Sequence, residues 1–295
     1  MNLRDRVTLF AFESAWRLLP RLAPARVDRL FTVLSDLAWL RHGPSVRQLE
    51  ANLARVTGQP HDSDAMRRLS RTSMRSYGAY WAALFGLSGL SDADIARRVQ
   101  VHGLHNLDGA MAAGRGVVIA AAHAGNWDLA GAWLGGHCAG LTTVAERLRP
   151  EELFQLFIEQ RARYGVEILP HRGGPRPPLE VLTERLQAGG VIALVCDRDL
   201  SRRGVEVQFF GATARMAAGP ATLALRTGAA LLVAGMWVEG DVLHLRFHPP
   251  LAPAVDADEA SAIARTSQMV ADIFEADIAA HPTDWHMLQR VWVEA

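Results

Sequence analysis

The stretch of sequence that decides the fold runs from residue 114 to residue 128 and reads GRGVVIAAAHAGNWD. Its apolar run, residues 117–122, predicts a buried strand, because a short apolar run bounded by glycine is typical of one. His123 ends the run, Asn126 is a favourable N-cap, and Asp128 falls in the first turn of the helix that would follow. His123 is therefore expected at the carboxyl end of a strand, where open α/β sheets bind their ligands.

His123 and Asp128 follow a His-x4-Asp pattern. A continuous helix would place the two side chains about 140° apart, so they can meet only if the chain turns between them, and Gly125 permits such a turn. A carboxylate bonded to one imidazole nitrogen leaves the other free to accept a proton. The pair would then suit a general base acting on a hydroxyl. The alternative is a histidine that ends the strand and an aspartate that complements the helix dipole.

Composition sets limits on the class of protein. The 295 residues carry 31 acidic and 31 basic side chains, all the basic ones arginine, so the formal net charge is zero. This balance lacks the strong positive charge of a nucleic-acid-binding protein. Cys138 and Cys196 have no His or Cys at metal-ligand spacing, so we expect buried thiols and no metal site. No signal peptide and no apolar run of about 18 residues is recognised, so no spanning helix is predicted.

Residues 3–40 predict two helices, divided by Pro20 and Pro24, in which aromatic and aliphatic residues alternate with arginines. Such amphipathic helices can lie in a membrane interface, but their apolar faces could equally pack on the rest of the domain. Residues 63–87 predict a longer helix, whose stripe of Met and aromatic residues is expected in the core rather than along an acyl-chain tunnel.

From about residue 97 the pattern alternates between strand and helix. Strands are predicted at 99–102, 116–122, 141–145, 166–169, 191–196 and 205–209, helices at 104–113, 126–135, 150–164, 179–188 and 218–227, a hairpin at 229–247 and a final helix at 261–280. This order predicts an α/β fold with a mixed, mainly parallel sheet sandwiched by helices. We expect one domain over 1–295, with its catalytic core in 97–250.

Charged residues follow two further predicted strands. Glu146 follows strand 141–145, with Arg161 on the next helix, and Asp197, Arg198 and Asp199 follow strand 191–196. These residues would lie at the same rim of the sheet as His123 and could bind substrate. The alternatives are an exposed ion pair of little energetic value and a solvated turn.

Two more arginines lie near possible anion sites. Arg202 belongs to a glycine-containing loop, and Arg215 precedes a predicted helix, so both could contact phosphate; each could equally face solvent. The sequence contains no phosphate-binding Walker loop, no dinucleotide-binding glycine pattern and no Gly-x-Ser-x-Gly elbow. Nucleotide hydrolysis and α/β-hydrolase chemistry are therefore disfavoured.

Five motifs in order resemble a known family. They are residues 123–128 (HAGNWD), 197–199 (DRD), 204–211 (GVEVQFFG), 215–220 (RMAAGP) and 282–292 (PTDWHMLQRVW). The chain resembles the bacterial lipid A lauroyl/myristoyl acyltransferases, a branch of the glycerolipid-type acyltransferases that use a His-x4-Asp motif. The runs AERLRPE at 145–151 and RDLSRRGVEV at 198–207 are more similar to the actinobacterial branch that acts on phosphatidylinositol mannosides.

The resemblance implies a peripheral enzyme on the cytoplasmic face of the cell membrane, without a metal or resident cofactor. It would transfer a fatty acyl group from acyl-CoA to the 6-hydroxyl of a mannose in a phosphatidylinositol mannoside. His123 carries over as general base and Asp128 as its orienting partner, while Glu146 and Arg161 match positions that shape the site. Asp197 falls where that branch has a Glu that positions the acceptor or supports the histidine.

Other functions fit the same residues. The acceptor could be a lipid A precursor or another glycolipid, although the neutral net charge and the two runs at 145–151 and 198–207 argue against lipid A. A thioesterase would need only water in place of the sugar hydroxyl. A non-catalytic lipid-binding protein could keep the fold, although it would not need His123 and Asp128.

Overall fold

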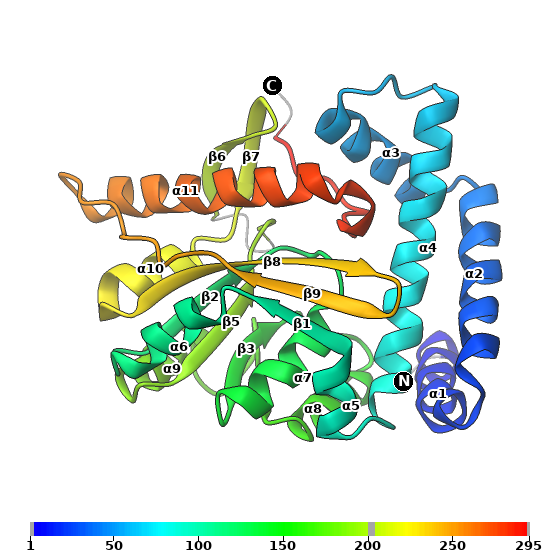
Figure 1. The fold of residues 1–295 in the computed structure, drawn as a ribbon, viewed down its shortest axis with the longest axis horizontal. Helices are drawn as coiled ribbons and strands as arrows, with labels where there is room; N and C mark the ends of the chain where they lie inside the picture. Colours follow the sequence, from blue (N-terminus) through cyan, green and yellow to red (C-terminus); the bar gives the residue numbers. More distant parts are fainter. Residues whose placement is uncertain (1–2, 200–203, 294–295) are drawn as a thin grey trace.

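A seven-stranded mixed sheet forms the centre of the protein (Figure 1). The computed structural model describes residues 3–199 and 204–293. Within these residues the strand order is β1-β9-β8-β2-β5-β3-β4, and β6 and β7 form a separate two-stranded hairpin. The strands are β1 (Val99–His102), β2 (Val117–Ala121), β3 (Leu141–Ala145), β4 (Val166–Pro170), β5 (Val191–Val195), β6 (Val205–Phe209), β7 (Ala212–Met216), β8 (Ala230–Glu239) and β9 (Val242–Phe247).

The sheet is parallel except for one pair. β8 and β9 run antiparallel and form the predicted hairpin, while the other described pairings of the sheet are parallel. β2 lies between β5 and β8 and every one of its residues is buried, which explains its unbroken apolar sequence. The expectation of a mixed, mainly parallel sheet is confirmed.

Helices cover both faces of the sheet. They are α5 (Asp92–Arg98), α6 (Leu104–Ala112), α7 (Trp127–His137), α8 (Glu151–Ala162), α9 (Pro178–Gln187), α10 (Gly219–Thr227) and α11 (Glu259–Ala280). Alternate residues of β2 point to opposite faces: Val118 packs in a core with α9, α10 and α11, and Ile119 packs in a second core with α5, α6 and α7. The result is a three-layer α/β/α arrangement.

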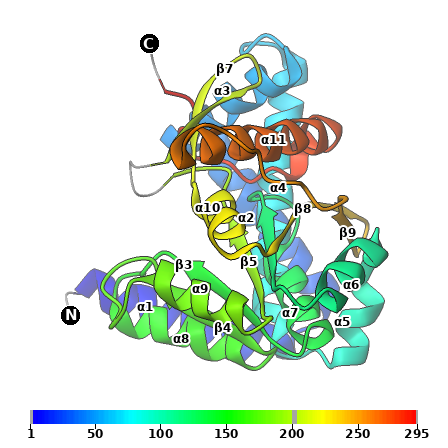
Figure 2. The same ribbon diagram turned by 90° about the vertical axis from the view of Figure 1, so that its left-hand side faces the viewer.

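Four N-terminal helices lie beside this core: α1 (Leu3–Leu18), α2 (Pro24–Leu40), α3 (Pro44–Thr57) and α4 (Asp64–Leu87). The short 3₁₀ helix Leu19–Arg21 separates α1 from α2 at the two prolines, as expected. α4 packs along α2 (Figure 1), and α1 lies beside α8 (Figure 2). The aromatic side chains of α4 form a buried cluster with Trp16 and Phe157, so the core interpretation of its stripe is confirmed.

Helix α5 and strand β7 are among the elements that the sequence analysis did not predict. Helix α5 is only seven residues long, and a capping box at Ser91 stabilises its N-terminus. Strand β7 pairs with β6 across residues 205–216, so Arg215 lies inside a strand, four residues before the start of α10. Among the residues that the structure describes, no helix has the length and apolar character needed to cross a bilayer.

Candidate active site

A buried aspartate holds the imidazole of His123. His123 follows the end of β2, and Asp197 follows the end of the neighbouring strand β5. The Nδ1–H group of His123 donates to Oδ1 of Asp197 at 2.5 Å, and its backbone N–H donates to Oδ2 at 3.0 Å. Asp197 is fully buried, whereas the His123 side chain is 26% exposed. A carboxylate on Nδ1 fixes the tautomer, so Nε2 keeps the lone pair that can accept a proton.

Asp197 stays ionised despite its burial. Burial alone would raise its pKa, but the nearby His123 and the hydrogen bonds from His123 and Trp285 lower the pKa below its ordinary value. The Trp285 indole Nε1–H donates to Oδ2 at 2.9 Å. The pair therefore has a fixed negative charge ready to stabilise an imidazolium on His123.

Asp128 has a different partner from the one expected. Gly125 does turn the chain, with φ of 57°, and Asn126 caps α7 by accepting from the backbone N–H of Leu129. Asp128, however, accepts from Arg161 Nε at 2.5 Å and from the Tyr80 hydroxyl at 2.7 Å. The prediction that Asp128 orients His123 is wrong, because the carboxylate on the imidazole is Asp197.

The burial of Asp128 explains this arrangement. Its side chain is 2% exposed and that of Arg161 is 20% exposed. A buried carboxylate needs a counter-charge and further hydrogen bonds, and α8 and α4 supply them through Arg161 and Tyr80. Burial, followed by the charge of Asp128, raises the pKa of Tyr80 well above its ordinary value, so Tyr80 remains a hydrogen-bond donor.

A C-terminal segment fixes the turn that carries His123. The backbone N–H of Gly125 donates to the carbonyl of Asp284 at 2.9 Å, and the backbone N–H of His286 donates to the carbonyl of His123 at 2.8 Å. Ala124 and Trp285 form an isolated antiparallel bridge between these bonds. The turn that carries His123 is therefore held from both sides, by β5 and by residues 284–286.

His286 is a second imidazole next to the pair, and it remains uncharged. It is 5% exposed, and burial, with a smaller effect from His123, lowers its pKa to about 3. The Ser76 hydroxyl donates to Asp284 at 2.6 Å and lies 3.0 Å from His286 Nε2. Since that hydroxyl proton goes to Asp284, His286 Nε2 is the donor to Ser76.

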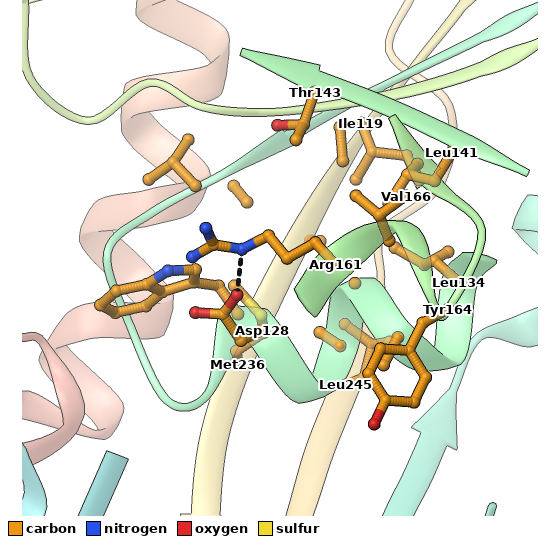
Figure 3. A pocket seen from close by; sticks show the side chains of 18 of the residues that line it. Ile119, Asp128, Leu134, Leu141, Thr143, Arg161, Tyr164, Val166, Met236 and Leu245 are labelled. Carbon is orange, nitrogen blue, oxygen red and sulfur yellow. Dashed lines mark hydrogen bonds and ion pairs between the residues drawn. The ribbon is translucent and has the colours of Figure 1, made fainter. Parts of the chain in front are cut away.

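An apolar pocket lies between the sheet and α7. Alternate residues of β2, β5 and β8 line its floor, with small side chains at Ala121, Ala193 and Ala234. Trp127 lines the pocket, and its ring centroid is 5.6 Å from that of His123. Figure 3 shows the stem of Arg161 crossing the pocket toward Asp128, with aliphatic side chains around it. The pocket is therefore separated from His123 by Trp127, and its lining is mainly apolar apart from the Asp128–Arg161 pair, Thr143 and Tyr164.

The other residues predicted to bind substrate are Glu146, Arg198, Asp199 and Arg202, together with Arg215. Arg198 is 3.7 Å from Glu146, and Arg198 Nε is buried without a hydrogen-bond partner among the described residues. Asp199 accepts from the backbone N–H of Gly204, the residue just before β6, at 2.7 Å. Arg202 lies outside the described residues.

Arg215 needs a correction. It pairs with Glu206 of the neighbouring strand at 2.7 Å, and the Glu206 side chain is 57% exposed. This is a cross-strand ion pair on a hairpin surface, not an anion site at a helix start.

Several residues of the site were not predicted. Trp127, Trp285 and His286 belong to motifs quoted above for their resemblance, yet no local pattern connects them with His123. The signal available in the sequence was an alanine in each of the three strands β2, β5 and β8, because a small side chain leaves space above the sheet.

The fold and the site together define an α/β protein with a histidine–aspartate pair near an apolar pocket. The sequence profile of the bacterial lipid A biosynthesis acyltransferase family matches residues 3–294. The chain belongs to this family, and it is an acyltransferase. It is 43% identical over 291 residues to the phosphatidylinositol mannoside acyltransferase of Mycolicibacterium smegmatis, covering 99% of this chain and 93% of that one. It is 44% identical over 288 residues to the protein of the same name from Mycobacterium tuberculosis, covering 97% and 89%.

Proposed function

We propose that this acyltransferase moves a fatty acyl group from acyl-CoA to the 6-hydroxyl of a mannose in phosphatidylinositol mannosides. The names of the two mycobacterial relatives support the acceptor. The observation that carries the chemistry is the His123–Asp197 pair near the apolar pocket. His123 is the general base, and Asp197, rather than Asp128, orients it.

The reaction balances with these groups. His123 Nε2 takes the proton of the hydroxyl as the hydroxyl oxygen forms a bond to the thioester carbonyl carbon. Asp197 stabilises the imidazolium, and backbone N–H groups at the start of α7 stabilise the oxyanion. The C–S bond then breaks, and the imidazolium returns the proton to the departing thiolate. No covalent acyl-enzyme is needed.

The acyl chain occupies the apolar pocket. Small residues at alternate positions of the strands leave space between the sheet and α7. The Asp128–Arg161 pair lies at this pocket (Figure 3). Its role is to hold α7, α8 and α4 together around the chain, which makes both residues structural supports of the donor site.

Arg198 binds a phosphate of the substrates. Its distance to Glu146 is longer than an ordinary charge-assisted hydrogen bond, and its Nε has no described partner. A guanidinium with unused donors suits a phosphodiester or a CoA phosphate. We propose that Glu146 positions Arg198 and that Arg202 contributes to the same contact.

Residues 1–40 bind the membrane surface. Large apolar side chains are exposed along α1 at Leu3, Val7 and Phe10 and along α2 at Val33 and Leu40, among others. An apolar stripe flanked by arginines binds an anionic lipid interface reversibly. We propose that the enzyme is a peripheral protein at the cytoplasmic face of the membrane, and the exposed apolar side chains of α1 and α2 support membrane contact.

The test is acyl transfer from palmitoyl-CoA to purified phosphatidylinositol mannosides by the wild type and by His123→Ala. We expect His123→Ala to lose roughly 10²–10⁴-fold in kcat, and His105→Ala, an exposed histidine on α6, to retain full activity. Transfer only to lipid A precursors or other glycolipids would overturn the acceptor. Release of free fatty acid without transfer would identify a thioesterase. An active His123→Ala would contradict the assignment of the base.

A further inference from the structure

We propose that Trp285 is a positioning residue of the reaction: its indole N–H orients the Asp197 carboxylate so that the carboxylate holds the His123 imidazole in the tautomer whose Nε2 can accept a proton. This inference rests on the proposed role of His123. It adds a residue from a third part of the chain to the pair.

The two carboxylate oxygens of Asp197 accept hydrogen bonds from different donors. Oδ1 of Asp197 accepts only the imidazole N–H of His123 among the described residues, at 2.5 Å. Oδ2 accepts two other donors, the backbone N–H of His123 at 3.0 Å and the indole N–H of Trp285 at 2.9 Å. These two donors fix the rotation of the carboxylate about its Cβ–Cγ bond. Oδ1 is thereby directed at Nδ1.

Trp285 is itself firmly held. It is fully buried, and its ring packs edge-on against Phe209 and Trp292 at centroid distances of 6.1 Å. The residues on either side of it bond the turn that carries His123, through the Asp284 carbonyl and the His286 backbone N–H. The indole donor therefore has a fixed position relative to both members of the pair.

The hydrogen bond that the Trp285 indole N–H donates goes to Asp197 and to none of the other charged groups near the pair among the described residues. His286 is neutral and buried next to His123. Asp128 behind Trp127 is paired with Arg161, and Arg198 beside Asp197 lies near Glu146. A change in the basicity of Asp197 therefore acts mainly on the proton shared with His123.

The consequence is a shift in pH dependence. A carboxylate that loses a hydrogen-bond donor becomes more basic. It then stabilises the protonated imidazole more strongly, so His123 stays protonated, and inactive as a base, up to a higher pH. The acidic limb of the profile of kcat/KM against pH therefore moves to a higher pH.

The experiment compares Trp285→Phe with Trp292→Phe, which is the same substitution on the neighbouring ring. Trp292 donates to the carbonyl of Phe209 at 2.7 Å and not to Asp197. We expect Trp285→Phe to move the acidic limb of kcat/KM upward by roughly half a pH unit to one unit and to lower kcat about tenfold. Trp292→Phe should leave the limb where it is in the wild type.

A second readout does not depend on turnover. In protein labelled at its histidines, the NMR resonance of His123, assigned by its loss in His123→Gln, should titrate at a higher pH in Trp285→Phe than in the wild type. An unchanged midpoint overturns the positioning role, whatever the activity. A wild type that transfers no acyl group overturns the proposed function instead, and the titration still decides the role of Trp285.

Trp285→Phe also opens space in the core, so unfolding must be separated from the electrostatic effect. Placing 3-benzothienylalanine at position 285 keeps both fused rings and replaces only the N–H by sulfur. We expect this protein to unfold at nearly the wild-type temperature and to show the same upward shift. A shift in Trp285→Phe that is absent from the benzothienyl protein would assign the effect to packing and overturn the proposal.

Discussion

The two aspartates near His123 differ in what they bind, and substitution should separate their roles. Asp197→Asn keeps the size of the side chain but removes the negative charge that faces Nδ1 of His123. We therefore expect kcat to fall roughly 10²–10⁴-fold with the fold intact. Asp128→Asn leaves Arg161 buried without its counter-charge, which should cost about 3–5 kcal/mol of unfolding free energy. Steady-state kinetics and urea unfolding on both variants check this. A stable but inactive Asp128→Asn would return Asp128 to the catalytic machinery.

His286 should make the protein sensitive to mild acid. Its pKa in the folded protein is about 3, against about 6.5 in an unfolded chain. Between these values the unfolded state binds a proton that the folded state does not, so stability falls as the pH falls below about 6.5. From pH 6.5 to pH 5 this loss is about 2 kcal/mol. In urea unfolding at several pH values, His286→Gln should be less stable at pH 7 but lose less on acidification. Equal slopes for both proteins would contradict the prediction.

At the level of the elements, the apolar stripe of α2 gives a direct test of membrane binding. Val33 is 51% exposed on that helix, and Val255, in the loop before α11, is 91% exposed. Val33→Asp should weaken binding to vesicles of anionic phospholipid at least several-fold, because it places a charge within the apolar stripe. Val255→Asp, the same change away from α1 and α2, should bind like the wild type. Vesicle cosedimentation measures both; equal binding by the two variants would exclude the helices as the contact.

The central strands β2, β5 and β8 were predictable because each is a mostly apolar run that begins one or two residues after a glycine. β7 was not, since its sequence Ala212–Met216 mixes one arginine with small residues and is stabilised by pairing with β6. The site shows the same limit. Asp128 is close to His123 in sequence and looked like its partner, whereas Asp197 is 74 positions away and reaches His123 only because β5 lies next to β2. Strand order, which no local pattern contains, decided between them.

At the scale of the whole molecule, α3 connects the N-terminal helices to the C-terminal segment. The fully buried side-chain amide of Asn52 donates to the carbonyls of Met287 and Gln289 at 2.8 and 2.9 Å. Asn52→Ala leaves both carbonyls without this donor, so we expect a loss of about 1–3 kcal/mol in stability and a lower kcat as residues 284–286 loosen. Gln48→Ala, which removes a bond to the other end of the same amide, should cost less. Calorimetry would measure the stability of both variants, and steady-state kinetics would measure their kcat. Unchanged kcat in Asn52→Ala would mean that the segment needs no support from α3.

The contacts of Trp285 also determine when a newly made chain acquires its base. Its indole donor comes from a residue 88 positions beyond Asp197, which itself lies 74 beyond His123. Contacts this distant in sequence close late in folding, since each pays the entropy of a long loop. Helices α1 and α2 are therefore complete in a growing chain long before the contacts among His123, Asp197 and Trp285 can form.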